Sequence, residues 1–262
     1  MDRLAPRERP DQLCVGLETW RELLFLHWAV PVREVRRLLP PGLQPDLFRG
    51  VAYVGVSVLE ATSARPAFVP LRVGLRFHQI TVRTYVHSAG DNPGLYLLSL
   101  DASSRLVPRL VRSLVNVPAY RAAVRVEQHG GSRGLELVRG GAEPADLKVR
   151  WRPARALGEL IPGTLAFFLL ERYMLYFESA GMLFRMRVHH APYQARNARI
   201  EELQGNLVAA AGVEAPAHRP RHAYLADQVE LEVFPPELVE RTVPVLDLEA
   251  DALAQGSRLV AV

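Results

Sequence analysis

Residues 20–43 constrain the fold more than any other part of the chain. They read WRELLFLHWAVPVREVRRLLPPGL. The apolar run at 23–30 predicts a buried strand, Pro31 predicts the start of a short helix over 32–39, and a Pro-Pro-Gly sequence then ends that helix. Arg21 precedes the apolar run. Because a guanidinium stays charged, a partly buried arginine needs an anionic partner, which is either a structural carboxylate or a ligand.

The rest of the first half alternates between strand and turn signals. Strands are predicted at 51–59, 80–87 and 95–100, with a loop at 61–76 and a hairpin turn at Asp91-Asn92-Pro93-Gly94. A helix is predicted from Ser103 or Ser104 to about Val115. Its expected apolar stripe consists of Leu106, Val107, Leu110, Val111 and Leu114, and its expected solvated face carries Arg105, Arg109 and Arg112.

The second half continues the same pattern. Segments 120–128 and 135–138 predict a second hairpin, and 147–151, 182–189 and 224–234 predict further strands. Helices are expected at 163–172 and 200–211, and 173–178 either extends the first of these or begins a strand. Many hairpin-linked strands with few helices predict an α+β fold that is mainly antiparallel β, with the sheet closing into a barrel or cone.

One domain is expected over residues 17–234. Residues 1–16 are expected to form an N-terminal arm, and residues 235–262 a C-terminal extension that is either packed on the domain or peripheral.

The composition argues against several classes of protein. No apolar run approaches the roughly 18–20 residues of a membrane helix, and the N-terminus lacks the apolar core of a secretory signal. The formal net charge is +4 and the charges are interleaved, so neither membrane nor nucleic acid is an expected partner. The single cysteine, Cys14, excludes an intramolecular disulfide and favours a reducing, cytoplasmic location. Homo-oligomerisation is left open.

No common cofactor or metal motif is present. The chain lacks a P-loop, a dinucleotide fingerprint, HExxH and CxxC, so neither cofactor nor metal is expected. His189 and His190 are adjacent on a predicted strand and point to opposite faces, which makes joint ligation of one metal awkward. Around Arg172, Tyr173 and Tyr176, two interpretations stay open, namely core filling and the rim of a cavity.

Six segments occur in an order and spacing that carry a family resemblance. They are WRELLFLHWAVPVREVRRLLPPGL (20–43), FHQITVRTYV (77–86), LYLLSLDASSRL (95–106), NVPAYRAAV (116–124), LLERYMLYF (169–177) and RVHHAPYQ (187–194). Together they resemble the YqjF-like family of unknown function. That family is similar in turn to the acetoacetate decarboxylase-like superfamily, chiefly over residues 20–48 and 77–124.

The resemblance implies a cone-shaped β-barrel whose interior holds an arginine, a glutamate and a Schiff-base lysine. Arg21 matches that arginine, and Arg112 matches an arginine that precedes the lysine turn. Gln79 stands at the glutamate position and Ala119 at the lysine position. Since alanine cannot form an imine, the resemblance implies the fold and an anion-binding arginine but not Schiff-base decarboxylation.

The sequence therefore predicts a central cavity that binds a small organic anion, a carboxylate or keto acid, through Arg21. The other expected ligand-binding residues are Gln79, Arg83, Tyr85, Arg112, Tyr120, Arg172 and Tyr173. If the protein is an enzyme, Tyr120, His189 and His190 are the candidate catalytic residues, because histidine or tyrosine would have to transfer protons. The alternatives are a lyase or hydrolase acting on a small keto or carboxylic acid, and a non-catalytic structural or interaction protein with a filled barrel.

Overall fold

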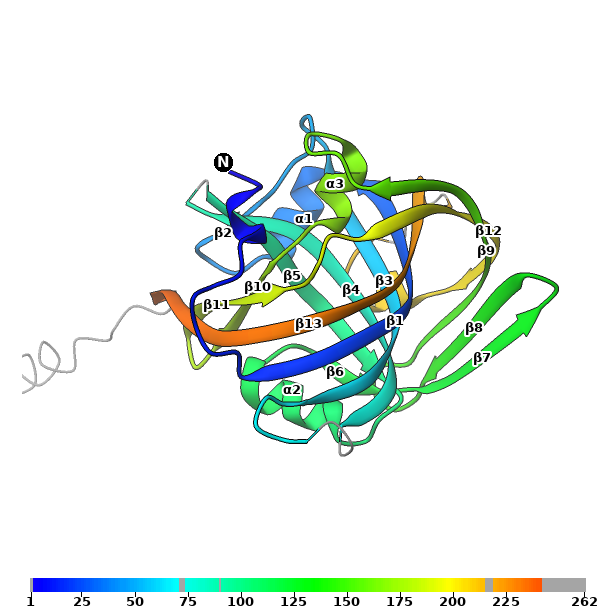
Figure 1. Cartoon of the computed structure of the whole chain (residues 1–262), viewed down its shortest axis with the longest axis horizontal. Helices are drawn as coiled ribbons and strands as arrows, with labels where there is room; N and C mark the ends of the chain where they lie inside the picture. The colour runs from blue at the N-terminus through cyan, green and yellow to red at the C-terminus, as the bar shows by residue number, and fades with distance from the viewer. Residues whose placement is uncertain (1, 71–73, 90, 215–218, 242–262) are drawn as a thin grey trace, which may run out of the picture.

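β1 (Gly16–Val30) is the strand on which the barrel closes, because it pairs antiparallel with β3 (Ala52–Pro66) on one side and with β13 (His222–Arg241) on the other. The computed structural model describes residues 2–70, 74–89, 91–214 and 219–241. Within them, seven strands form the closed barrel in the order β1-β3-β4-β5-β10-β11-β13. Figure 1 shows β1 and β13 running side by side across it. The predicted barrel is confirmed.

The remaining barrel strands are β4 (Leu75–Ser88), β5 (Asp91–Ala102), β10 (Met174–Ser179) and β11 (Met182–His189). β5 and β10 pair in parallel, and the other neighbours in the barrel pair antiparallel. The sheet continues outward from β13 through β12 (Gln194–Gly205), β9 (Ala145–Glu159), β8 (Ser132–Arg139) and β7 (Ala123–His129). Two short strands, β2 (Leu43–Pro45) and β6 (Ala119–Arg121), pair with β4 and β5.

β1 is buried on both faces, which accounts for its continuous apolar run. Leu23 and Phe25 belong to the cluster inside the barrel, whereas Leu24, Leu26 and Trp28 belong to a second cluster that includes residues of β8 and β9. Side chains alternate between the two faces of a strand, so a strand between two cores must be apolar at successive positions.

Short helices lie at the ends of the barrel (Figure 1). α2 (Val107–Val115) lies at one end and α3 (Leu165–Leu170) toward the other. Both contribute side chains to the interior cluster, including Val107 from α2 and Phe167 from α3. The other helices are η1 (Ala5–Arg7), α1 (Val32–Leu38) and α4 (Leu207–Ala210).

The strand, helix and stop expected at 20–43 are confirmed by β1, α1 and the turn before β2. Residues 173–178 contribute to a strand, β10, rather than extending α3. The expected loop at 61–76 is shorter in the structure, because β3 runs to Pro66 and β4 begins at Leu75. Residues 235–241 continue β13 and pair with β11, while 242–262 lie outside the described residues.

The helix predicted at 200–211 is wrong. β12 continues to Gly205, and only the single turn of α4 follows. Gly205 has φ +120°, which no helix accommodates. The side-chain oxygen of Asn206 then accepts a 2.9 Å hydrogen bond from the backbone N–H of Asp146, at the start of β9. A positive φ at one glycine therefore divides a segment whose composition favours helix.

The apolar stripe predicted for α2 is also only partly correct. Val107 is buried and Val111 packs on the interior cluster. Leu106, Leu110 and Leu114 instead have exposed fractions of 46%, 45% and 68%. The barrel end accepts one narrow row of the helix, so the leucine row remains in solvent.

A buried ion pair fixes the segment after β2 to the segment after α3. Arg172 Nη1 lies 2.8 Å from Asp46 Oδ2, and both side chains are almost fully buried. Arg3 reaches the same carboxylate through two contacts of 2.5 and 2.6 Å, which attaches the N-terminal arm to the barrel. Burial would raise the pKa of Asp46, but Arg3 and Arg172 hold it below its usual range.

We expect Gly205→Ala to lower the free energy of unfolding by more than about 1 kcal/mol, because φ is positive and a Cβ would overlap the carbonyl oxygen of Asp146. Urea unfolding followed by circular dichroism measures the change. Gly140→Ala is the control, since a Cβ there meets no atom within 4 Å. Equal stability of the two variants would contradict the account of β12.

We expect Asp46→Asn to cost about 3–5 kcal/mol, because it leaves Arg172 buried without a counter-charge. Asp227→Asn is the matched control, since it breaks the ion pair with Arg196 in which the Asp227 side chain is 71% exposed, and should cost less than about 1 kcal/mol. Both are measured by urea unfolding at pH 7. Similar losses would show that burial of the Asp46 pair is immaterial.

The pH dependence of Asp46→Asn provides an independent measurement. A carboxylate with a lowered folded pKa stabilises the protein above the unfolded value, near 3.9, and this contribution is lost as the pH falls through the folded pKa. The wild-type protein should therefore lose part of its stability below about pH 4, and the variant should lack that part of the slope. Parallel curves for the two proteins would contradict the lowered pKa.

Candidate functional site

The interior of the barrel carries a row of polar side chains among apolar ones. Phe77 and Tyr85 of β4 lie in the interior cluster. Residues 79, 81 and 83 occupy every second position between them, so they face the same side. In the sheet register, Arg83 lies opposite Gly55 of β3, and Gly55 lies opposite His27 of β1. His27, Gly55 and Arg83 thus form one row across three adjacent strands.

Arg83 is a buried charge without a counter-charge. The residue is 6% exposed, and its Nε has no hydrogen-bond partner. Its guanidinium carbon lies 5.1 Å from the centroid of the Phe25 ring. No ion pair joins Arg83 to any carboxylate of the described residues. Among the described residues, the Phe25 ring and the Tyr85 hydroxyl interact with this charge, and no carboxylate pairs with it.

His27 is the second unsatisfied group in this row. It is fully buried, and neither ring nitrogen has a hydrogen-bond partner among the described residues. Burial, followed by the charge of Arg83, lowers the pKa of His27 well below its usual range, so the ring is neutral at pH 7. A neutral imidazole offers one N–H donor and one acceptor to a molecule held beside it.

Gly55 allows His27 and Tyr85 to approach each other. A Cβ at this position would lie 3.1 Å from His27 Cδ2 and 3.4 Å from the Tyr85 hydroxyl. The Tyr85 hydroxyl donates a 2.8 Å hydrogen bond to the carbonyl of Leu169 in α3. Burial raises the pKa of Tyr85, which keeps the hydroxyl protonated.

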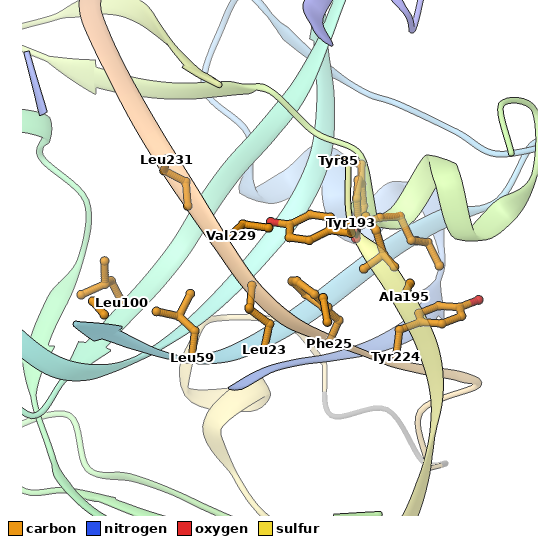
Figure 2. Close-up of a cluster of buried hydrophobic side chains, with 14 of the residues drawn as sticks. Leu23, Phe25, Leu59, Tyr85, Leu100, Tyr193, Ala195, Tyr224, Val229 and Leu231 are labelled. Atoms are coloured by element: carbon orange, nitrogen blue, oxygen red, sulfur yellow. Dashed lines mark hydrogen bonds between the residues drawn. The ribbon is translucent and has the colours of Figure 1, made fainter. Parts of the chain in front are cut away.

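The next row of the interior is also polar. The hydroxyls of Ser57 and Thr81 lie 2.6 Å apart and are buried. Phe25 stands opposite Ser57 in the register, and its ring meets Tyr193 edge-on with centroids 5.5 Å apart. Figure 2 shows Phe25, Tyr85 and Tyr193 converging with side chains of β1, β3 and β13 in the same interior.

Tyr173 and His190 belong to a buried network that meets the interior at Tyr193. Glu171 accepts a hydrogen bond from the Tyr173 hydroxyl and another, at 2.9 Å, from the backbone N–H of Tyr193. The His190 ring stacks on Tyr173 with centroids 4.6 Å apart, and burial lowers its pKa to about 4. These contacts hold both rings against buried neighbours. His189, beside them, is partly exposed.

Arg21, by contrast, does not lie in the interior. Its side chain is exposed, and a register shift separates it from Leu24. Glu22 has φ +57°, which marks a β-bulge at this point of β1. The bulge breaks the alternation, so Trp20 packs against the interior cluster and Arg21 faces outward. The expectation that Arg21 is partly buried is therefore wrong.

The remaining predicted residues are dispersed. Arg172 is paired with Asp46, so its charge has a structural partner. Gln79 is half-buried on β4, and Ala119 is fully buried in the interior cluster. Arg112 and Tyr120 line a pocket on the outer side of α2 and β6, away from the row of Arg83. Tyr120, His189 and His190 form no hydrogen bond with one another.

Sequence reasoning missed His27, Ser57, Thr81 and Tyr193 as interior polar residues. A signal was available for His27, because it shares the alternation of Leu23 and Phe25. Ser57 and Thr81 are indistinguishable from ordinary strand residues until the register of β3 and β4 is known.

Among the described residues, no group of three or more His, Cys, Asp or Glu side chains is arranged to hold a metal ion. None of the helices in the same part of the chain is long and apolar enough to cross a membrane.

Solved structures with the same fold are distant in sequence. The enduracididine biosynthesis enzyme MppR, in complex with pyruvate, gives a TM-score of 0.62 at 15% identity and covers 90% of this chain and 95% of its own. An acetoacetate decarboxylase-like enzyme from Sphingomonas wittichii RW1 gives 0.59 at 12% identity, covering 88% and 95%. Acetoacetate decarboxylase from Legionella pneumophila gives 0.57 at 10% identity, covering 91% and 96%. These likenesses confirm the fold.

Comparison of sequences identifies the family. The uncharacterized protein YqjF of Bacillus subtilis (strain 168) is 30% identical over 220 residues, which is 84% of this chain and 90% of YqjF. The model of the DUF2071 family, described as an uncharacterized conserved protein, matches residues 18–230. The chain therefore belongs to the DUF2071 family.

Proposed function

We propose that this protein binds a small organic anion, a carboxylate or keto acid, in the barrel interior, with Arg83 as the cation that holds it. The observation that carries the proposal is the burial of Arg83 without a carboxylate partner among the described residues. A buried charge without a partner costs several kcal/mol. An anion beside the guanidinium would offset that cost and would gain charge-assisted hydrogen bonds.

The neighbours of Arg83 suit one negative charge. His27 is neutral and can donate a hydrogen bond to a carboxylate oxygen, and no acidic side chain stands opposite Arg83 in the register. The hydroxyls of Ser57 and Thr81 supply donors and acceptors one row away. A monoanion of few atoms fits this arrangement better than a polyanion.

Imine chemistry finds no support in the interior. Lys148, the one lysine of the chain, lies on β9 between Glu136 and Glu202 at 3.4 and 3.3 Å, and is 47% exposed. Hydrogen bonds to these two carboxylates raise its pKa, opposite to what a nucleophilic amine needs. We therefore propose that the protein binds the anion, and we propose no imine step. The complex of MppR with pyruvate motivates the choice of pyruvate as a probe.

We expect a thermal-shift and calorimetric screen of acetate, pyruvate, acetoacetate and 2-oxoglutarate to find a ligand that stabilises the wild-type protein. A ligand at 100 times its Kd adds about 2.7 kcal/mol. In Arg83→Met the shift should disappear while the ligand-free protein stays folded, because an apolar side chain replaces an uncompensated buried charge. Association should be slower than about 10⁵ M⁻¹s⁻¹, since α2 and α3 close the barrel ends.

Arg21→Ala is the matched control, because it removes an exposed arginine of the same barrel and should leave the ligand shift unchanged. Retention of the shift in Arg83→Met, or its loss in Arg21→Ala, would overturn the assignment to Arg83. If no probe stabilises the wild-type protein, the interior is a filled core and the non-catalytic alternative replaces this proposal.

A further inference from the structure

A basic pocket of about 510 Å³ lies on the outer side of α2, where the helix meets β6. Four arginines and Tyr120 line it. Arg109 and Arg112 belong to α2, Arg105 lies just before this helix, and Arg121 belongs to β6. Arg109 and Arg112 are three positions apart and share one face of α2, and Arg105, just before the helix, lines the same pocket. Valines of α2 on the other side pack in the barrel, which separates this pocket from Arg83.

The ends of the pocket are fixed by the backbone. Asn116 ends α2 in the left-handed region with φ +45°, and the chain turns back into β6. Arg112 Nη1 then donates a 2.5 Å hydrogen bond to the carbonyl of Ala119. This contact joins helix to strand and fixes one of the guanidiniums that line the pocket.

The positive charges of the pocket are not balanced by the protein. No ion pair involves Arg105, Arg109, Arg112 or Arg121 within the described part of the chain. Elsewhere on the surface, basic residues are neutralised, as where Arg150 and Arg152 pair with Glu202 and Glu201 at 2.6 Å. Like charges four residues apart on a helix repel, so a cluster of this kind favours an anion between them.

Two acids that act on Tyr120, Glu143 and Asp101, have contacts of their own. Glu143 accepts a 2.5 Å hydrogen bond from the Tyr120 hydroxyl. Asp101 is fully buried 3.3 Å from Arg139, and burial raises its pKa to about 6. The guanidinium carbon of the buried Arg139 lies 3.9 Å from the centroid of the Tyr120 ring and so packs against one face of this ring. Tyr120 is a fixed aromatic wall rather than a free side chain.

We propose that this pocket binds a phosphorylated small molecule. Guanidinium forks match phosphate oxygens bidentately, and a phosphate monoester carries close to two negative charges at neutral pH. Four arginines suit two such groups, or one diphosphate, better than a single carboxylate. A volume of about 510 Å³ exceeds what an inorganic phosphate fills, so an organic portion can lie against Tyr120.

The test is isothermal titration of the full chain with inorganic pyrophosphate, adenosine 5′-diphosphate and citrate at one fixed ionic strength. We expect measurable binding of the two phosphate compounds and weaker binding of citrate. The double variant Arg105→Gln/Arg109→Gln should weaken the phosphate compounds by at least about tenfold. Neither side chain has a hydrogen bond or ion pair among the described residues, and the backbone bond from Arg109 N–H to the carbonyl of Leu106 does not depend on the side chain, so the variant should fold.

Arg33→Gln/Arg36→Gln is the matched control, because it removes two exposed arginines from α1 and changes the net charge equally. It should alter the Kd by less than about threefold. Arg83→Met should keep phosphate binding, which separates this site from the interior one.

Equal weakening in both double variants would overturn the proposal, because it would show attraction by net charge alone. Unchanged binding in Arg105→Gln/Arg109→Gln would place the ligand elsewhere. Absence of binding of both phosphate compounds, with binding of a single-stranded oligonucleotide that falls steeply with salt, would assign the arginines to a nucleic-acid backbone instead.

Discussion

The pairing of β1 with both β3 and β13 is the constraint on which the other features depend. It converts an open sheet into a closed barrel and removes two edges that would otherwise be exposed. It also places β1 between two cores, so that Phe25 and His27 face the interior while Leu24 and Leu26 face the outer layer. The polar row around Arg83 is buried because this closure surrounds it.

Two buried arginines show how the surroundings of a residue distinguish structure from function. Arg172 and Arg83 lie in the same barrel region and both contact aromatic rings. Arg172 has Asp46 at 2.8 Å, and its Nε donates a 2.7 Å hydrogen bond to the carbonyl of Phe168. Arg83 has neither a carboxylate nor a partner for its Nε. Of these two, therefore, only Arg83 is buried without a counter-charge from the described residues.

Much of the fold is predictable from local patterns, and the errors have identifiable causes. The strand and helix of residues 20–43 follow from an apolar run and from prolines whose effect is local. The position of Arg21 does not, because a bulge at Glu22 reverses the alternation and depends on pairing with distant strands. The segment 200–211 reads as a helix closed by Gly212, but pairing with β9 and the positive φ of Gly205 override that local pattern.

The candidate site is harder to predict for the same reason. Arg83 and Tyr85 were predicted as ligand residues, whereas His27, Ser57 and Thr81 join them only through the register of three strands.

The position where the resemblance implies a Schiff-base lysine has a different use in this chain. Ala119 fills the interior with a methyl group, and its carbonyl accepts the hydrogen bond of Arg112 on the outside. One strand, β6, thus closes the apolar end of the barrel and orients a guanidinium in the outer pocket. Because the side chain of an alanine needs little room, α2 can pack closely over this end, with Val107 inside and its arginines outside. That packing separates the singly charged interior from the multiply charged surface pocket. The valines of α2 face the interior, and its arginines face the pocket.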